Sequence, residues 1–268
     1  MYNKNVALVI SLYLLSMSFP QQIFSKVHYS RMMNPTINSS SNFSITDVRS
    51  IENRLRSSLE QKINRNSRSR GLPSNESPSE FDYLALLRIW NRLSPEFQQL
   101  YKMAATIPDN FISYRSPSGH FEIYYTLSGR DRVDSTDNYS FSKSDWRVKI
   151  NQKNGVPDYI DEVGWALDSS WSQLINNFGL TPPIPYTDTK HPSNIYKVIV
   201  EAQDYGYYGV TYPGIKKSSD EKGYSSYMSL RNEWSASEWS SSGYDKNPAD
   251  GIRVTCIHEF THSIQYAM

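Results

Sequence analysis

Apolar residues recur at helical spacing in several stretches of the chain. In residues 44–63, five of them share one face while the opposite face is charged: Val48, Ile51, Leu55, Leu59 and Ile63. Three further stretches also predict helices: residues 81–93, 95–105 and 159–178. Ser94 and Pro95 are typical of a helix start, because serine caps free N–H groups and proline suits the first helical position.

Three other stretches are rich in residues that favour β-structure. HFEIYYTL (120–127) alternates between apolar and polar positions, and IYKVIVEA (195–202) and YSSYMSLRN (224–232) have the composition of strands. The last stretch is a candidate edge strand, with an interior position in the sheet as the alternative. Strands mixed with helices in this way predict an α+β fold with a mixed sheet.

The N-terminal segment has the order of a secretory signal peptide. Lys4 precedes an apolar run from Val6 to Phe19, and small residues follow. We therefore expect residues 1–25 to be a signal peptide and the mature protein to be secreted without stable membrane association; an uncleaved anchor is the alternative. Residues 26–80 are then a helical prosegment or a retained N-terminal extension, ending in a polar linker, and 81–268 form the main domain.

Composition narrows the function classes. The formal net charge is +1, so nothing favours nucleic acid as a partner. Cys256 is the single cysteine, which excludes an intramolecular disulfide and a multi-cysteine zinc site. We expect Cys256 to be a small buried residue of a helix.

The stretch NPADGIRVTCIHEFTHSIQYA (247–267) predicts a helix that carries the pattern H-E-x-x-H. His258 and His262 are four residues apart, so their imidazoles share a helix face and can bind one metal ion. Ile257, Phe260 and Ile264 fall on the other side of the helix and can bury it in a core.

This pattern predicts metal-assisted hydrolysis. In catalytic zinc sites the ion has three protein ligands and a water, whose pKa it lowers. His258 and His262 are the expected ligands, and Glu259 is the expected general base, which takes the proton of the attacking water. The substrate is then a protein or peptide, and an extended peptide could pair with strand 224–232.

HEFTHSIQY resembles the active-site helix of a family of secreted bacterial metallopeptidases best represented in myxobacteria. Four more stretches are similar to that family in the same order: YLALLRIWNRLSPEFQQLY, SPSGHFEIYYTLSGRDRVDSTD, NGVPDYIDEVGWALDSSWSQL and NIYKVIVEAQDYGYYGVTYPG. The resemblance covers residues 80–268. It implies a zincin fold of the gluzincin type and peptidase activity.

The resemblance also implies a third zinc ligand, a glutamate on a later helix. Glu233, Glu238 and Asp250 do not match that position, and nothing follows Met268. We therefore expect the N-terminal part of a zincin with its C-terminal part missing, and a poor or inactive peptidase for the chain as given. The rival hypothesis is a secreted or surface binding protein that keeps the H-E-x-x-H helix without catalysis.

The stretch NQKNGVPDYIDE (151–162) is similar to an acidic loop of the same family that suggests calcium. Gly155 takes the sixth place of a calcium loop, but Ile150 and Gln152 stand where two oxygen ligands belong. A structural turn that caps the next helix is the favoured interpretation, and a calcium site is the alternative.

Overall fold

The computed structural model describes residues 44–63, 78, 80–142, 144–187, 194–203, 207–214, 223–234 and 247–268. The chain divides into two compact units, 1–44 and 45–268, and the fold below is that of the second. The predicted signal peptide and residues 64–77 of the predicted linker lie outside the described residues. None of the helices described in these ranges is long and apolar enough to cross a membrane.

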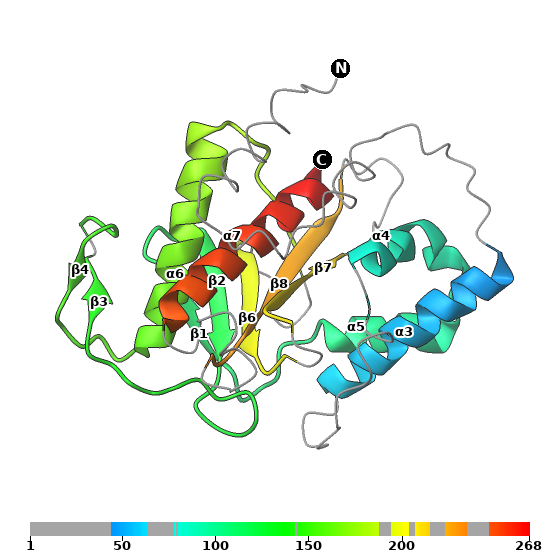
Figure 1. The fold of residues 1–268 in the computed structure, drawn as a ribbon, viewed down its shortest axis with the longest axis horizontal. Helices are drawn as coiled ribbons and strands as arrows, with labels where there is room; N and C mark the ends of the chain where they lie inside the picture. Colours follow the sequence, from blue (N-terminus) through cyan, green and yellow to red (C-terminus); the bar gives the residue numbers. More distant parts are fainter. Residues whose placement is uncertain are drawn as a thin grey trace. The chain divides into compact units, whose positions relative to one another are not determined.

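A mixed β-sheet forms the centre of this unit (Figure 1). Its strands are β1 (Ile112–Arg115), β2 (Phe121–Tyr125), β5 (Ile184–Pro185), β6 (Tyr196–Glu201), β7 (Gly209–Pro213) and β8 (Ser225–Arg231). Strands β2, β6 and β8 are parallel neighbours, while β1 is antiparallel to β2 and β7 is antiparallel to β8. The short strand β5 is parallel to the first residues of β8. The predicted α+β fold with a mixed sheet is therefore correct.

Strand β8 lies inside the sheet, which settles the alternative left open for residues 224–232. Met228 pairs with Val198 of β6 on one side and with Thr211 of β7 on the other. The candidate edge position of this stretch is therefore wrong. Among the described strands β7 is an edge strand, since it pairs with β8 alone, and the sequence pattern does not predict it because Gly209 and Pro213 bound it closely. Proline in a strand is typical of an edge, where no neighbour needs its missing N–H.

One face of the sheet is covered by α6 (Asp158–Trp171), the π-helical turn η3 (Ser172–Asn177) and α7 (Pro248–Ala267) (Figure 1). Side chains of β2, β6 and β8 meet both helices in a continuous apolar core. Phe260 and Ile264 of α7 are buried and Ile257 packs at the margin, as the helix pattern predicts. Burying this stripe leaves the opposite side of α7 available for polar groups.

The other face carries α3 (Ile45–Ile63), α4 (Glu80–Ile89), the 3-10 turn η2 (Trp90–Arg92) and α5 (Pro95–Ala104). Tyr83 of α4 packs edge-on against Tyr212 of β7, and the Tyr101 hydroxyl of α5 donates to the Pro213 carbonyl at 2.7 Å. The predicted cap of α5 is confirmed, because Ser94 Oγ accepts from the N–H of Phe97 at 3.2 Å.

The predicted boundary near residue 80 does not coincide with a gap in the packing. The compact unit begins at Ile45, and α3 packs against α5 inside it. A small hairpin, β3 (Ser140–Phe141) and β4 (Lys149–Ile150), rests on α6, with Phe141 stacked over Trp165.

Candidate metal centre

The two predicted ligands lie together on α7. Nε2 of His258 is 3.0 Å from Nε2 of His262, and the two rings meet at 83°. Thr255 and Glu259, each three residues before one of these histidines, are on the stripe of α7 that contacts β7. The imidazoles are therefore held beside the edge strand.

Gln265 orients one of the two rings. Its side-chain oxygen lies 2.9 Å from Nδ1 of His262, so Nδ1 donates its proton there. The lone pair of Nε2 then points toward His258, which is the tautomer that binds a metal through Nε2. Gln265 follows His262 by three residues, a spacing that places both on one helix face.

Glu259 is turned toward the sheet and is 5% exposed. Thr211 of β7 donates its hydroxyl to Oε2 of Glu259 at 2.8 Å and lies 2.9 Å from the Glu259 carbonyl oxygen. The same carbonyl accepts from the Ser263 hydroxyl at 3.0 Å. A buried carboxylate needs such donors, because water no longer solvates it.

Gly209 allows this close approach of β7 to α7. A Cβ atom on Gly209 would lie 2.9 Å from Cγ of Glu259 and 2.9 Å from Cγ2 of Thr255. Any side chain at this position would force the strand and the helix apart. Gly209 and Thr211 are two residues apart, so they face α7 from the same side of the strand.

The donor set fits a zinc ion in part. Two nitrogen ligands at the usual zinc distance, with tetrahedral geometry, are about 3.3 Å apart, close to the observed separation of the imidazoles. No third His, Cys, Asp or Glu side chain completes a metal-binding group within the described residues. Asp250 lies two turns earlier on α7, and Glu233 pairs with Arg231 at 3.3 Å. Glu238 is outside the described residues.

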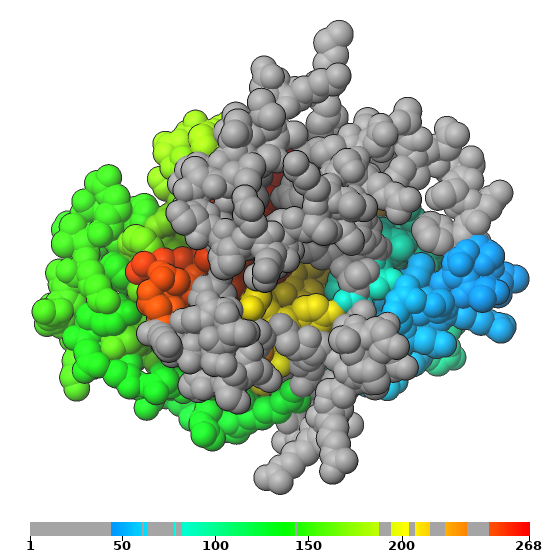
Figure 2. Space-filling view, in the orientation of Figure 1, coloured from blue at the N-terminus to red at the C-terminus, as the bar shows by residue number. Residues whose placement is uncertain are grey.

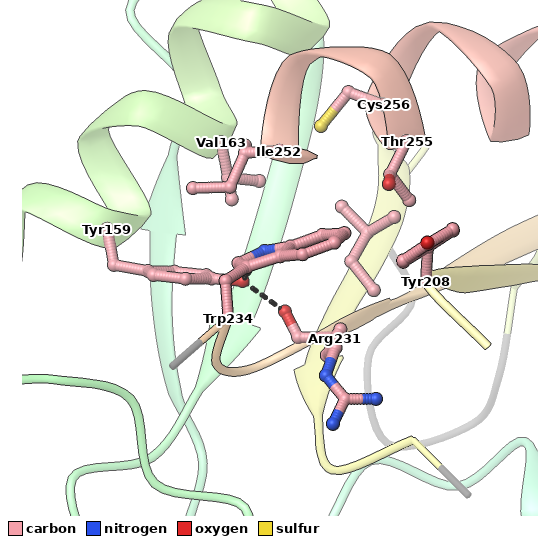
Figure 3. A pocket seen from close by; sticks show the side chains of 9 residues that line it. Tyr159, Val163, Tyr208, Arg231, Trp234, Ile252, Thr255 and Cys256 are labelled. Atoms are coloured by element: carbon pink, nitrogen blue, oxygen red, sulfur yellow. Dashed lines mark hydrogen bonds between the residues drawn. The ribbon is translucent and has the colours of Figure 1, made fainter. Parts of the chain in front are cut away.

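Cys256 is fully buried, as the sequence predicts. Burial raises the pKa of its thiol well above the usual value, so it stays protonated at neutral pH. Cys256 lines a cavity of about 10 Å³ beneath the N-terminal half of α7 (Figure 3). Beside it, Trp234 donates from Nε1 to the Tyr159 hydroxyl at 3.0 Å and stacks on Tyr208. Such a space holds about one water molecule, so it is a packing feature and not a substrate pocket.

The loop with the calcium-like pattern is held to residues 137–139 by Asp137 and Asp158. Asp137 accepts from the N–H groups of Asn154 and Gly155, at 3.2 and 2.9 Å. Asp158 accepts in return from the N–H groups of Asn138 and Tyr139, at 2.8 and 3.0 Å. The structural turn before α6 is thus present, and these contacts account for the two carboxylates.

No protein-family model, curated protein or solved structure matches the chain. The resemblance to the myxobacterial-type metallopeptidases therefore rests on the quoted stretches alone and stays a prediction. The assignment of His258, Glu259 and His262 rests on their spacing and on the geometry of α7.

Three residues of this site are missing from the sequence prediction: Gly209, Thr211 and Gln265. Gln265 could be found from helical spacing, since it follows His262 by three. Thr211 is 48 residues from Glu259, and its contact depends on how β7 pairs with β8. No local sequence pattern predicts such a contact.

Proposed function

We propose that the protein is a secreted, zinc-dependent peptidase of the zincin type. The observation that carries the proposal is the pair of imidazoles on α7, with Nε2 atoms 3.0 Å apart beside a carboxylate that β7 holds in place. His258 and His262 would hold the zinc ion. The antiparallel strand β7 next to this helix adds support, because among the described strands it pairs with β8 alone and an extended peptide could pair with its other edge.

When bound, zinc lowers the pKa of water and polarises a peptide carbonyl. Glu259 is the general base: it takes the proton of the attacking water and delivers it to the leaving amine. Thr211 restrains the Glu259 side chain through Oε2, which limits the carboxylate to a small range of positions. Gln265 keeps the proton of His262 on Nδ1.

The peptide would pair with β7. Tyr208 accepts from Arg231 and Gly214 donates to Ser225, so even-numbered residues of β7 face β8. The backbone groups of Gly209 and Thr211 consequently point to the outer edge, on the strand that holds Glu259. This reassigns the predicted peptide-pairing strand from β8 to β7. In Figure 2, yellow atoms of the residue range that holds β6 and β7 are visible between α7 and α3.

The first test is zinc binding by the chain itself. Titration should show one site per chain, and His258→Ala and His262→Ala should each weaken it strongly. Gln265→Ala should lower the affinity by about tenfold to a hundredfold, the usual effect of removing a group that orients a ligand. Unchanged zinc affinity in both histidine variants would remove the metal centre from the proposal.

The second test is peptide hydrolysis. The resemblance predicts the remaining ligand on a later helix, so we would assay a version extended through the next encoded helix against its Glu259→Gln variant. Cleavage that Glu259→Gln abolishes while zinc stays bound supports the peptidase. If the extended protein and its Glu259→Gln variant both bind zinc and neither cleaves the peptide, the result favours the rival hypothesis, a secreted binding protein that keeps the motif.

A further inference from the structure

Helix α3 buries its apolar face in the core of the unit. Four apolar residues of α3 are buried, two of them completely: Val48, Ile51, Leu55 and Leu59. They face α5 and α4 and leave the charged side of the helix outward. If α3 dissociated from this packing site, it would expose both its own apolar stripe and the apolar side chains that the stripe covers.

Polar contacts fix α3 along its length. Arg54 forms a two-point ion pair with the buried carboxylate of Asp82 on α4, at 2.5 and 3.3 Å. Glu52 accepts from the N–H and the hydroxyl of Ser94, at 3.2 and 2.6 Å. Because Ser94 caps α5, its hydrogen bonds with Glu52 join α3 to the N-terminus of α5. Burial raises the pKa of Glu52, but hydrogen bonds from Ser94 and Arg56 outweigh it, so the pKa lies below its usual value.

The last turn of α3 reaches the sheet. The ammonium of Lys62 pairs with Glu201 of β6, and both side chains are less than a tenth exposed. The same ammonium lies 4.9 Å from the ring centre of Tyr212 on β7 and 5.8 Å from that of Tyr227 on β8. Lys62 therefore contacts three strands at once, across 139 residues of sequence in the case of Glu201.

Tyr212 connects this contact to the candidate metal centre. It follows Thr211 directly on β7, so the two side chains point to opposite faces of the sheet. Thr211 contacts Glu259 of α7, while Tyr212 stacks on Tyr227 and contacts Lys62. The edge strand is thus held between α7 on one face and α3 on the other.

We propose that α3 is a lasting part of the folded unit and not a segment that processing removes. Cleavage between residues 64 and 77 leaves α3 bound to its seat on α4, α5 and the sheet as a separate fragment. Lys62 then still anchors β7 from the face opposite to Glu259. The inference depends on the packing of α3 and not on the proposed peptidase activity.

The test is an inserted protease recognition sequence between residues 64 and 77. After complete cleavage, both fragments should elute together in native size-exclusion chromatography, and mass spectrometry should identify them in one peak. As matched control, the same cleavable protein carrying Leu55→Asp and Leu59→Asp should lose the α3 fragment on cleavage. Separation of the unsubstituted fragments would overturn the proposal, whether or not the larger one stays folded.

Hydrogen exchange tests the contact with β7. In Lys62→Met, the amides of Val210 and Tyr212, which face β8, should exchange at least tenfold faster, while Lys62→Arg keeps the charge and restores much of the protection. Lys102→Met, an exposed lysine in the last turn of α5, should leave exchange at β7 unchanged. Equal exchange at β7 in the Lys62→Met and unsubstituted proteins would contradict the anchor, and circular dichroism confirms that each variant is folded.

Discussion

The two faces of the sheet bury different kinds of side chains. Against α6 and α7, strands present apolar side chains such as Phe121, Val198 and Leu230, each at most 3% exposed. On the opposite face, the same strands present Glu201, which pairs with Lys62 of α3, and Ser229 beside it, also buried. Alternation along each strand makes this division possible, since neighbouring residues point to opposite faces.

The difference shows how far the packing of each face depends on particular residue partners. The apolar face gains free energy from burial, which is strong but tolerates changes in detail. The polar face depends on particular partners: Glu201 needs the Lys62 ammonium and the Ser229 hydroxyl, and Gln203 donates to Ser229 at 2.5 Å. Glu259 is one of the polar groups buried on the apolar face, and its carboxylate accepts from Thr211.

The largest expected effect comes from opening the apolar face. Phe260→Ala removes a fully buried ring that packs against Phe121 and Trp171. We expect the free energy of unfolding to fall by about 3–5 kcal/mol, measured by urea denaturation. Leu127→Ala, at a residue that is 48% exposed, is the control and should change little. A loss below about 1 kcal/mol for Phe260→Ala would mean that this core is not what holds the unit together.

The polar face is tested by a double-mutant cycle. Lys62→Met leaves Glu201 buried without its cation and should cost about 3 kcal/mol of unfolding free energy. Adding Glu201→Gln to Lys62→Met should recover part of that loss, because an amide tolerates burial better than an unpaired carboxylate. Strictly additive losses in the double variant would show that the two residues do not act as a pair.

The close approach of β7 and α7 gives a smaller effect. Gly209→Ala places a methyl group 2.9 Å from Glu259 Cγ and should cost about 1–3 kcal/mol. Gly129→Ala serves for comparison: the added methyl meets open space there, and only the φ of 74° opposes it, for about 1 kcal/mol. If Gly209→Ala proves no worse than Gly129→Ala, the approach is looser than the structure indicates.

The smallest effect concerns pH and Asp161 of α6. Burial raises the pKa of Asp161 to about 6, despite hydrogen bonds from Tyr114 and Asn154. The unfolded chain loses this proton near its ordinary pKa of 3.8. Between those values the folded state holds more protons, so the contribution of Asp161 to stability decreases as pH rises from about 4 to 6.

Urea denaturation at several pH values checks this sign. The stability of the unsubstituted protein minus that of Asp161→Asn should decrease from about pH 4 to about pH 6 and level off above. For Asp145→Asn the same difference should stay flat, because its carboxylate is exposed and its pKa is lowered by Arg147 to below this range. A flat difference for Asp161→Asn would show that its carboxylate is ionised throughout.

The sequence predicts the elements that rely on local patterns. The stripe of α3, the Ser94 cap of α5 and the strands β2, β6 and β8 follow from spacing and composition, and so does the H-E-x-x-H helix. The position of β8 inside the sheet does not, because an edge and an interior strand share the same pattern when both faces are covered. The position of the Glu259 side chain depends on Gly209 and Thr211, whose roles arise only when β7 and α7, which are distant in the sequence, pack together.

The pairing of Thr211 with Glu259 has a consequence for folding. Every strand described in the sheet precedes α7 in the sequence, so a ribosome makes the whole apolar face before the helix that covers it. Until α7 docks, α6 covers this face alone, Phe121 lacks its contact with Phe260, and Thr211 of β7 lacks its contact with Glu259. Nascent chains at this stage should be the ones that aggregate or need a holding chaperone, and the candidate metal centre should be among the last parts to become native.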